Sequence, residues 1–534
     1  MTPRAAISQL AKMVGQDLRR GKPSDGALSA GPLLASAGAT VQIVEGLVTE
    51  TRRKRPNNEL IQGYAFILGS ALDSLRLDVN GGRTQARAEI EEVRQAAEQA
   101  VMQGGVSGTV LMLVGRAFTD AQLDPGRALQ EALMKTMERE DAPQDDLPSL
   151  QAMSDQLAKV AKALDDDPFA IHAELAQTGG ALPAETRAML AASFAASDVP
   201  AIRDATLGFA LDTDREVSSA VLSILANSGT GQIVSSATID RLVRIRPWLV
   251  EARRSEVDAA IRTLRPKAGP PAGEPRAEIR TVMASMADGS GAQSLFAIVR
   301  RGRRLALASV LVKVEQGVAD AWVRDGMTKA EADTMIEDIL TAAEAVEVSI
   351  GMFERRVAAA LATNLKRGVP PPFGLLQVTE ILGLGVLQPE ALAADVLADE
   401  LLADVPSIEI DDRAKLRARR ASTDWLYNID TIRSWFEAGE AVDELLRPIK
   451  ARREQIEAVL TQYLPARRLF WAERCAWTAY MLKEAQEKDP WDWIAFALVA
   501  RDFAGDHPLD ALPIAKQIAE ATADAFGMRS AGRR

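Results

Sequence analysis

The stretch NNELIQGYAFILGSALDSL, residues 57–75, decides how the fold is interpreted. Its apolar side chains recur every three or four residues, at Leu60, Ile61, Tyr64, Ile67, Leu68, Ala71, Leu72 and Leu75. This period is that of an α-helix, and the wide apolar stripe indicates a helix that is buried over much of its surface. Almost every other segment has the same period, and almost none alternates with a period of two. We therefore expect an all-α, multi-domain chain.

Composition excludes several classes of protein. The chain has 534 residues, with 63 Lys and Arg against 74 Asp and Glu, 1 Cys and 2 His. One cysteine cannot form an internal disulfide, and so few cysteines and histidines predict no metal centre. The net charge of −11 argues against a globally basic nucleic-acid-binding protein, although local basic patches remain possible. Arg outnumbers Lys by 48 to 15, which we attribute to a GC-rich bacterial genome.

The clearest linker is Pro-Lys-Ala-Gly-Pro-Pro-Ala-Gly-Glu-Pro-Arg at residues 266–276. Four prolines and two glycines cannot continue a helix, so we place a domain boundary there. The resulting division is an N-terminal helical domain at 1–150, a middle segment at 151–265 and a C-terminal helical domain at 277–534. Thr328 and Glu331 form a capping-box pattern, which predicts a helix that begins there and runs to Asn364.

The middle segment carries a weak internal repeat. Asp167, Ala170, Ile171 and His172 recur 31 residues later as Asp198, Ala201, Ile202 and Arg203. Each copy opens a short helix beside a proline, and a second helix follows near 183–196 and 214–226. A third pair fits 236–247 and 250–264. Two helices per 30–40 residues is the period of a helical solenoid. By its correspondence with Arg203, His172 is expected at the surface or in a cap.

The run Asp214-Arg215-Glu216-Val217, followed by Ala220, Val221, Ile224 and Leu225, resembles a HEAT-type repeat. An aspartate-led turn before a helix with an apolar inner face is the pattern of that family. The resemblance spans about residues 165–265, and a Gly-rich loop at 229–231 departs from it. It implies a superhelical α-solenoid that binds partners, and it carries no catalytic residue.

Aromatic residues gather near the C-terminus, where residues 425–503 contain 13 of the 25 in the chain. Arginines are interleaved with them. One interpretation is a helical core filled with large rings. The other is a groove lined by Trp and Arg, because these residue types are enriched at binding hot spots. For that groove we select Trp425, Trp435, Arg467 and Arg468.

A second basic candidate is Arg300-Arg301-Gly302-Arg303-Arg304. In a helix, Arg300, Arg301 and Arg304 would project within one sector and form a positive patch, while neighbouring apolar residues face a core. Arg300, Arg301, Arg303 and Arg304 are therefore candidates for binding phosphate or an acidic protein surface.

No motif identifies a reaction. Cys475 and His507 are the one thiol–imidazole pair considered, and a buried cysteine is the simpler interpretation. The Gly-rich stretches lack the features of a phosphate-binding loop, so we expect no catalytic residue, metal or cofactor. An enzyme that uses carboxylates in a C-terminal pocket remains a third hypothesis.

The sequence thus predicts a non-enzymatic helical scaffold or adaptor that binds a protein partner. The alternative is a nucleic-acid-binding HEAT-like protein that uses Arg-rich helix faces. No apolar run is long enough to span a membrane, and no signal peptide is evident, so the cytoplasm is the expected location. The sequence does not indicate an oligomeric state.

Overall fold

The computed structural model describes residues 3–20, 38–80, 84–103, 108–121, 123–140, 150–227, 235–269, 278–406, 410–485 and 490–531. The chain forms two compact units. The first unit comprises residues 1–209 and 214–221, and the second unit comprises residues 210–213 and 222–534.

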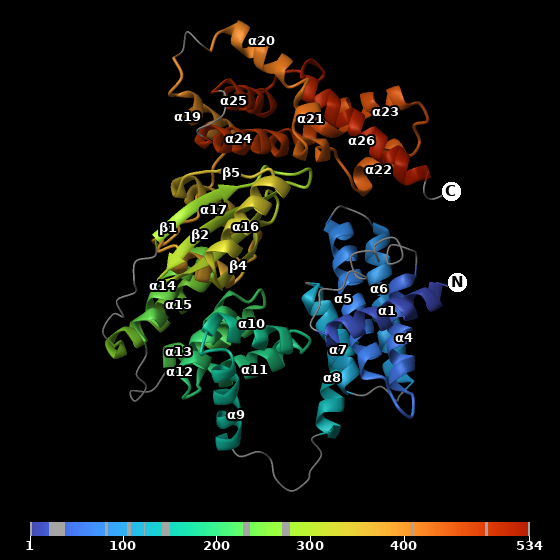
Figure 1. Cartoon of the computed structure of the whole chain (residues 1–534), viewed down its shortest axis with the longest axis vertical. Coiled ribbons are helices and arrows are strands. Elements are labelled where there is room, and N and C mark those ends of the chain that lie inside the picture. Colours follow the sequence, from blue (N-terminus) through green and yellow to red (C-terminus); the bar gives the residue numbers. More distant parts are fainter. Residues whose placement is uncertain are drawn as a thin grey trace. The chain divides into compact units, whose positions relative to one another are not determined.

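The first unit is helical in the part that the structure describes, and its helices are coloured from blue to green in Figure 1. They are α1 (Pro3–Arg19), α4 (Ala39–Thr51), α5 (Asn58–Asn80), α6 (Thr84–Met102), α7 (Gly108–Asp120), α8 (Arg127–Glu140), α9 (Leu150–Ala163), α10 (Pro168–Gly179), α11 (Ala184–Ala195), α12 (Pro200–Ala205) and the first part of α13 (Arg215–Asn227).

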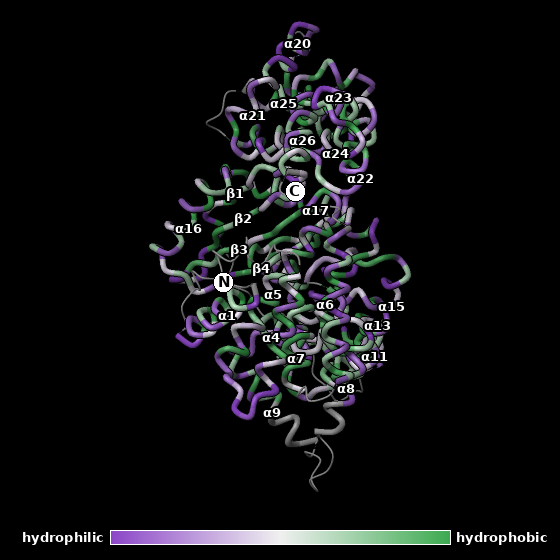
Figure 2. Tube along the Cα trace, turned by 90° about the vertical axis from the view of Figure 1, so that its right-hand side faces the viewer, coloured by the Kyte–Doolittle hydropathy of each residue, from purple (hydrophilic) through white to green (hydrophobic). Residues whose placement is uncertain are grey.

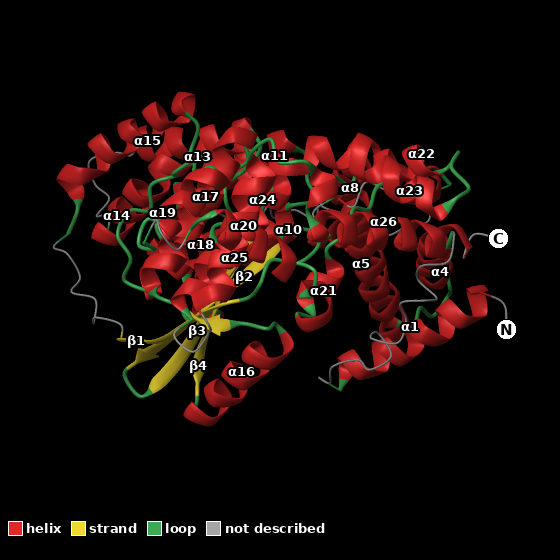
Figure 3. Ribbon diagram, turned by 90° about the horizontal axis from the view of Figure 1, so that it is seen from above, coloured by secondary structure: helices red, strands yellow, loops and turns green. Residues whose placement is uncertain are grey.

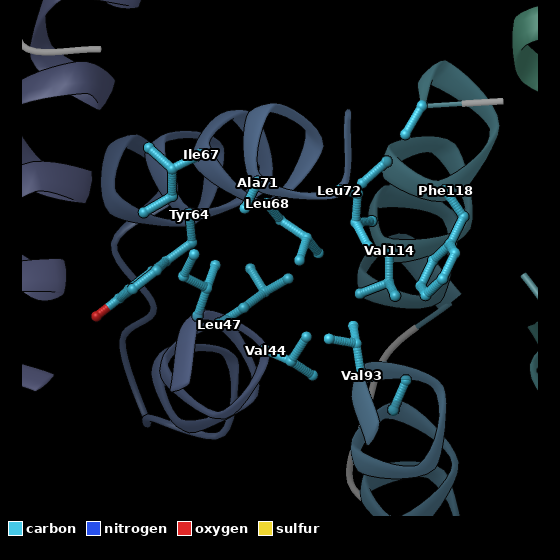
Figure 4. Packing of buried hydrophobic residues seen from close by; sticks show 14 of the residues in the cluster. Val44, Leu47, Tyr64, Ile67, Leu68, Ala71, Leu72, Val93, Val114 and Phe118 are labelled. Atoms are coloured by element: carbon cyan, nitrogen blue, oxygen red, sulfur yellow. The ribbon is translucent and has the colours of Figure 1, made fainter. Parts of the chain in front are cut away.

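Helix α5 is the centre of the first unit's core, and it confirms the helix expected from residues 57–75. The side chain of Asn57 caps it, because Oδ1 accepts a hydrogen bond of 3.1 Å from Leu60 N. Seven of its apolar side chains are buried, namely Ile61, Tyr64, Ile67, Leu68, Ala71, Leu72 and Leu75. Figure 4 shows α5 meeting side chains from α4, α6 and α7, among them Leu47, Val93 and Phe118.

Helices α1 and α5 cross at very close range. A Cβ on Gly15 would lie 2.0 Å from Glu59 O, and a Cβ on Gly63 would lie 1.8 Å from Ala11 O. No side chain fits at such separations, so glycine at these two positions sets the approach of the two helices.

The middle helices lie where the repeat pattern predicts them. Asp167 caps α10, since its Oδ1 accepts a hydrogen bond of 2.9 Å from Phe169 N, and Pro168 occupies the first helical position. Helix α10 packs on α12, which also contacts α9 and α11. The expected third pair is present as α14 (Ser236–Ile245) and α15 (Glu251–Leu264), which belong to the second unit.

The second unit adds a sheet and many helices. Its strands are β1 (Glu278–Ala284), β2 (Ala292–Arg301), β3 (Arg304–Lys313), β4 (Gly317–Met327) and β5 (Val346–Glu347). Its further helices are α16 (Lys329–Ala342), α17 (Ile350–Arg367), α18 (Gly374–Ile381), α19 (Ala394–Leu402), α20 (Asp412–Ala421), α21 (Trp425–Asn428), α22 (Glu440–Leu446), α23 (Arg452–Ala458), α24 (Arg468–Glu484), α25 (Pro490–Ala504) and α26 (Pro513–Ala531).

The sheet is antiparallel, with strand order β4-β3-β2-β1-β5. Helix α16 covers one face, where Met283, Ile298 and Leu307 form a core with Ala332 and Ile339. Helices α17 and α18 pack on the strands from the other side, as Figure 3 shows. Both faces of the central strands are therefore buried. In Figure 2, α20 stands out as polar.

The third pair of middle helices packs within this second unit. Trp248, at the end of α14, is buried, and its Nε1 donates a hydrogen bond of 3.0 Å to Leu387 O. Arg241 forms a bidentate pair with Glu380 of α18, at 2.8 and 3.0 Å. The division between the units therefore does not coincide with the predicted boundaries at 150 and 266.

The chain is mostly helical, as expected, but an all-α fold is wrong for the region between β1 and β5. The expected single helix from Thr328 to Asn364 is also wrong, because α16 ends at Ala342 and α17 begins at Ile350 after β5. The capping box itself is confirmed, with Thr328 and Glu331 bonding reciprocally at the start of α16. Of the predicted linker, residues 270–276 lie outside the described residues.

None of the helices that the structure describes is long and apolar enough to cross a membrane.

Candidate functional site

The predicted arginine cluster lies on a β-hairpin, which corrects the expectation of a helical patch. Arg300 and Arg301 are the last residues of β2, and Arg304 is the first residue of β3. Arg301 and Arg304 are opposite each other in the strand register on the two sides of the turn. Gly302 has φ 60°, a left-handed conformation that glycine adopts without strain. Glycine at the first central position of a two-residue turn fits type II′, whose twist matches that of the strands.

Charge at this hairpin tip is only partly balanced. Arg300 pairs with Glu278 of β1 at 3.4 Å, and Arg301 pairs with Asp325 of β4. Arg303 and Arg304 are exposed, and neither forms an ion pair or a side-chain hydrogen bond with a described residue. The basic hairpin, defined as residues 300–304, therefore presents two exposed arginines at the end of a rigid element, and the charge of Arg304 also acts on Glu331 at the start of α16.

The predicted aromatic groove is not present at the two selected tryptophans. Trp425 is 7% exposed and stacks on Phe496, with ring centroids 3.7 Å apart. Trp435 is fully buried, and its Nε1 donates a hydrogen bond of 2.9 Å to Ala287 O. Both rings fill the core of the second unit, so neither is available to stack on a partner. This corrects the expectation of a groove in favour of the core interpretation.

The two selected arginines in this region are held by the protein itself. Arg467 pairs with Glu315 at 2.6 Å and with Glu437 at 3.0 Å. Arg468 donates hydrogen bonds of 2.7 Å to Gly505 O and His507 O, which fixes the loop after α25. The structure therefore does not bring Arg467 and Arg468 together with the basic hairpin as one binding surface.

A buried arginine cluster joins the sheet to α17 and α24, and the sequence analysis did not select it. Arg474 of α24 is fully buried; its Nη2 donates to Gly289 O at 2.5 Å, and its guanidinium lies 4.3 Å from the centre of the Trp471 ring. Its Nε and Nη1 have no hydrogen-bond partner among the described residues. Burial lowers the pKa of Arg474 to about 9.

Arg356 of α17 completes this cluster. Its Nε donates a hydrogen bond of 2.8 Å to Gln293 of β2, and its guanidinium lies over the Trp477 ring at 4.6 Å. Burial lowers the pKa of Arg356 to about 10 and raises that of the neighbouring Glu473. The only sequence signal was arginine within apolar helices, which surface arginines with buried stems also give.

The thiol of Cys475 is a poor nucleophile here. Its side chain is fully buried in α24, and burial raises its pKa. Within the described residues no cluster of three or more His, Cys, Asp or Glu side chains is arranged to hold a metal ion.

One open pocket of about 450 Å³ lies in the first unit, between α6 and α8. Both of its arginines have partners within the protein. Arg94 donates to Asp124 O at 2.7 Å and to Glu91 at 3.0 Å, while Arg127 pairs with Glu131 at 2.7 Å. The pocket therefore offers no unpartnered cation to an anionic ligand among the described residues.

Two parts of the chain match models of domains that are named after the same protein, Y4lR. Residues 395–527 match the model described as the Y4lR C-terminal helical domain, and residues 183–268 match the Y4lR second domain. The chain is also 25% identical over 475 residues to the "Uncharacterized protein y4lR" of Sinorhizobium fredii (strain NBRC 101917 / NGR234). That similarity covers 87% of this chain and 88% of the relative.

These two regions are similar to y4lR. Helices α19 to α26 agree with a C-terminal domain described as helical, and α11 to α15 lie in the region matched to the second domain. The sheet and its basic hairpin lie between the two matched regions. No solved structure matches the chain.

Proposed function

We propose that this protein is a non-enzymatic, cytoplasmic scaffold that binds a protein partner, and that the basic hairpin is its docking element. The observation that carries the proposal is the exposure of the Arg303 and Arg304 side chains, which form no ion pair or side-chain hydrogen bond with a described residue. They project from a turn that two ten-residue strands hold in place. The rigid backbone of the turn loses little conformational entropy on binding, and each guanidinium group can match a carboxylate bidentately.

The charge of the whole chain supports a protein partner over a nucleic acid. With a net charge of −11, the molecule repels a long polyanion, whereas an acidic segment of a protein needs to meet only one small basic site. Arg300 and Arg301 lie beside this site. Their ion pairs with Glu278 and Asp325 hold their side chains in place.

We also propose that the paired helices between residues 165 and 265 are HEAT-like units of the scaffold. Support comes from their placement at the bounds that the repeat pattern predicts and from the packing of α10 on α12 and of α14 on α15. Stacked helix pairs leave broad outer faces, which suit a docking protein.

The test compares two double variants of the full-length chain. Arg303→Glu with Arg304→Glu reverses the hairpin, and Arg447→Glu with Lys450→Glu makes the same change of net charge at exposed residues of the same unit. Each is used to capture proteins by cross-linking from a lysate of the source cells, followed by mass spectrometry. We expect a cross-linked partner set that the control retains and the hairpin variant loses.

A partner set retained equally by both variants would contradict the role of the hairpin. Nucleic-acid binding is tested separately by filter binding at 50 and 200 mM salt. Saturable binding that falls by about 10³ or more over this range would favour the nucleic-acid alternative.

A further inference from the structure

One edge of the sheet is open beside the first half of β1, and we call the space along residues 278–281 at this edge the lane. On one side β1 pairs with β2 from Glu278 to Ala284. On the other side its strand pairing is limited to Met283 and Ala284, which face β5, and a hydrogen bond of 2.9 Å from Val348 N to Val282 O. Residues 278–281 have no strand partner on that side within the part of the chain that the structure describes. Unpaired N–H and C=O groups at a sheet edge are a template for another strand.

The lane is vacant because the chain leaves the sheet at Ser349. Ser349 caps α17, with its Oγ accepting a hydrogen bond of 3.1 Å from Met352 N, and the helix then carries the chain away. A pocket of about 270 Å³ remains there, lined by residues 279–282 and by Glu347, Val348 and Ile350. The Thr281 hydroxyl in its wall is buried and has no hydrogen-bond partner among the described residues.

Charged side chains of both signs flank this lane, with Glu278 and Glu347 exposed beside it. Arg280 is exposed and forms no ion pair with a described residue. At the same end of the sheet, Glu278 is paired with Arg300, so the basic hairpin begins one strand away. Apolar side chains from Ile279, Val282, Val348 and Ile350 share the pocket wall.

The same features disfavour pairing with a second copy of β1. The ladder between β1 and β2 has a bulge between Ile279 and Thr281, which locally disrupts the strand. Antiparallel pairing of two copies centred there would also place Arg280 opposite Arg280, and like charges directly opposite are destabilising. A strand that places a carboxylate opposite Arg280 meets the reverse situation, because the two charges attract.

We propose that an extended, acidic segment of a protein partner adds to the sheet as a strand beside residues 278–281 of β1. This inference rests on the proposed function and names the mode and chemistry of the docking. The added strand continues the lane of β5 and, if it also runs antiparallel to β1, ends near the basic hairpin. Four residues extend over about 13 Å, and alternate side chains point to opposite faces of the sheet. Apolar residues enter the pocket while a carboxylate meets Arg280.

The experiment uses the full-length chain and fluorescein-labelled six-residue peptides that alternate Val or Ile with Asp or Glu. Binding is measured by fluorescence anisotropy. A matched set carries N-methyl groups at alternate backbone nitrogens, which removes hydrogen-bond donors along one edge and preserves every side chain. We expect saturable binding of at least one unmodified peptide and a loss of about tenfold or more on N-methylation, because at least two backbone hydrogen bonds are lost.

Protein variants locate the binding. Arg280→Glu is expected to weaken the best peptide about tenfold, whereas Arg447→Glu leaves its affinity unchanged. Val348→Trp, which fills the pocket, is expected to weaken it as well. Circular dichroism confirms that each variant is folded.

Two results would overturn the inference and leave the proposed function standing. In the first, the N-methylated peptides bind as well as the unmodified ones while Arg303→Glu with Arg304→Glu weakens both, which means docking by charge alone. In the second, no peptide binds saturably although the cross-linked partner set still depends on the hairpin. A dimer in sedimentation analysis that Arg280→Glu alters would assign the edge to a second copy and would also overturn it.

Discussion

The side chain of His172 shows how far a residue can lie from its expected setting. The repeat alignment places it at the surface or in a cap, but in the structure the side chain is half-buried and lies against Phe209, with ring centroids 4.7 Å apart. Gly208 makes room for the ring, since a Cβ there would lie 2.3 Å from it. Burial is the main cause that lowers the pKa of His172 to about 4, and a backbone hydrogen bond at Ala205 opposes it.

We predict that α10 and α12 lose stability as the pH falls from 7 to 4. The unfolded chain binds a proton near pH 6.5, whereas the folded chain binds it only near pH 4. The contribution of neutral His172 is therefore complete above pH 6.5 and declines below it, by up to about 3 kcal/mol. Hydrogen-exchange protection of α10 in the full chain, corrected for intrinsic rates, measures the loss. His172→Leu should flatten this dependence, and an unchanged slope in that variant would contradict the assignment.

Two glycines of α5 form a matched pair for a second prediction. Gly63→Ala places a methyl group 1.8 Å from Ala11 O and is expected to cost about 3 kcal/mol, because α1 and α5 must move apart. Gly69→Ala meets nothing within 4 Å and is expected to stabilise the helix by about 1 kcal/mol. Thermal unfolding of both variants measures the difference. Equal effects would show that the helix crossing tolerates a side chain.

Among the elements, Glu344 links the end of α16 to the turn at Thr431–Ser434. Its carboxylate accepts hydrogen bonds from Asp430 N at 3.0 Å and Thr431 N at 2.7 Å, and from the Thr431 hydroxyl. Its φ of 45° is uncommon for a residue with a side chain. Burial would raise the pKa of Glu344, but these hydrogen bonds lower it overall.

We predict that Glu344→Ala destabilises the second unit by about 2 kcal/mol, because it leaves the donors of the turn without their acceptor. Glu344→Gly should cost less, since it also relieves the backbone strain. The wild-type contribution is present above pH 4.5 and is lost as the pH falls through the lowered folded-state pKa. Thermal unfolding at pH 7 and pH 4 tests this, with Glu337→Ala at an exposed position of the preceding helix α16 as the control.

Element by element, the sequence predicted the helices well and the sheet not at all. The stripe in α5 has one solvated side, so its period is visible. Strands β2 and β3 are covered on both faces, so Ile298 and Val299 are both buried and no alternation appears. The remaining signal was the Gly302 turn between two apolar runs, which is typical of a hairpin. The composition of the basic hairpin was therefore predicted, but its conformation was not.

The same limit applies to Trp425 and Trp435. Large rings suit a helical core and a binding groove equally, and only the positions of Phe496 and Ala287 decide between them. Both partners are more than 70 residues away along the chain, so no local pattern records the contact.

The whole molecule consists of two units with different constructions, one an assembly of helices and the other a sheet between helical layers. Different cores hold them, with Leu68 at the centre of one and Ile298 in the other. We expect a protein of two such units to unfold in more than one step.

We predict at least two transitions when the full chain is heated in a calorimeter. Gly63→Ala should lower the midpoint of one transition, and Glu344→Ala that of another, because the two residues belong to different units. A shift of the same transition by both variants would show that the units unfold together.

The buried contact between Arg474 and Gly289 has a consequence for synthesis on the ribosome. The two residues are 185 positions apart, so the strands emerge long before the helix that encloses their loop. At about 5–20 residues per second, the loop that carries Gly289 waits roughly 10–40 s for Arg474, although α16, α17 and α18 are made in time to cover the strands. Until then this loop lacks its buried partner, and slow translation beyond β4 would lengthen that interval.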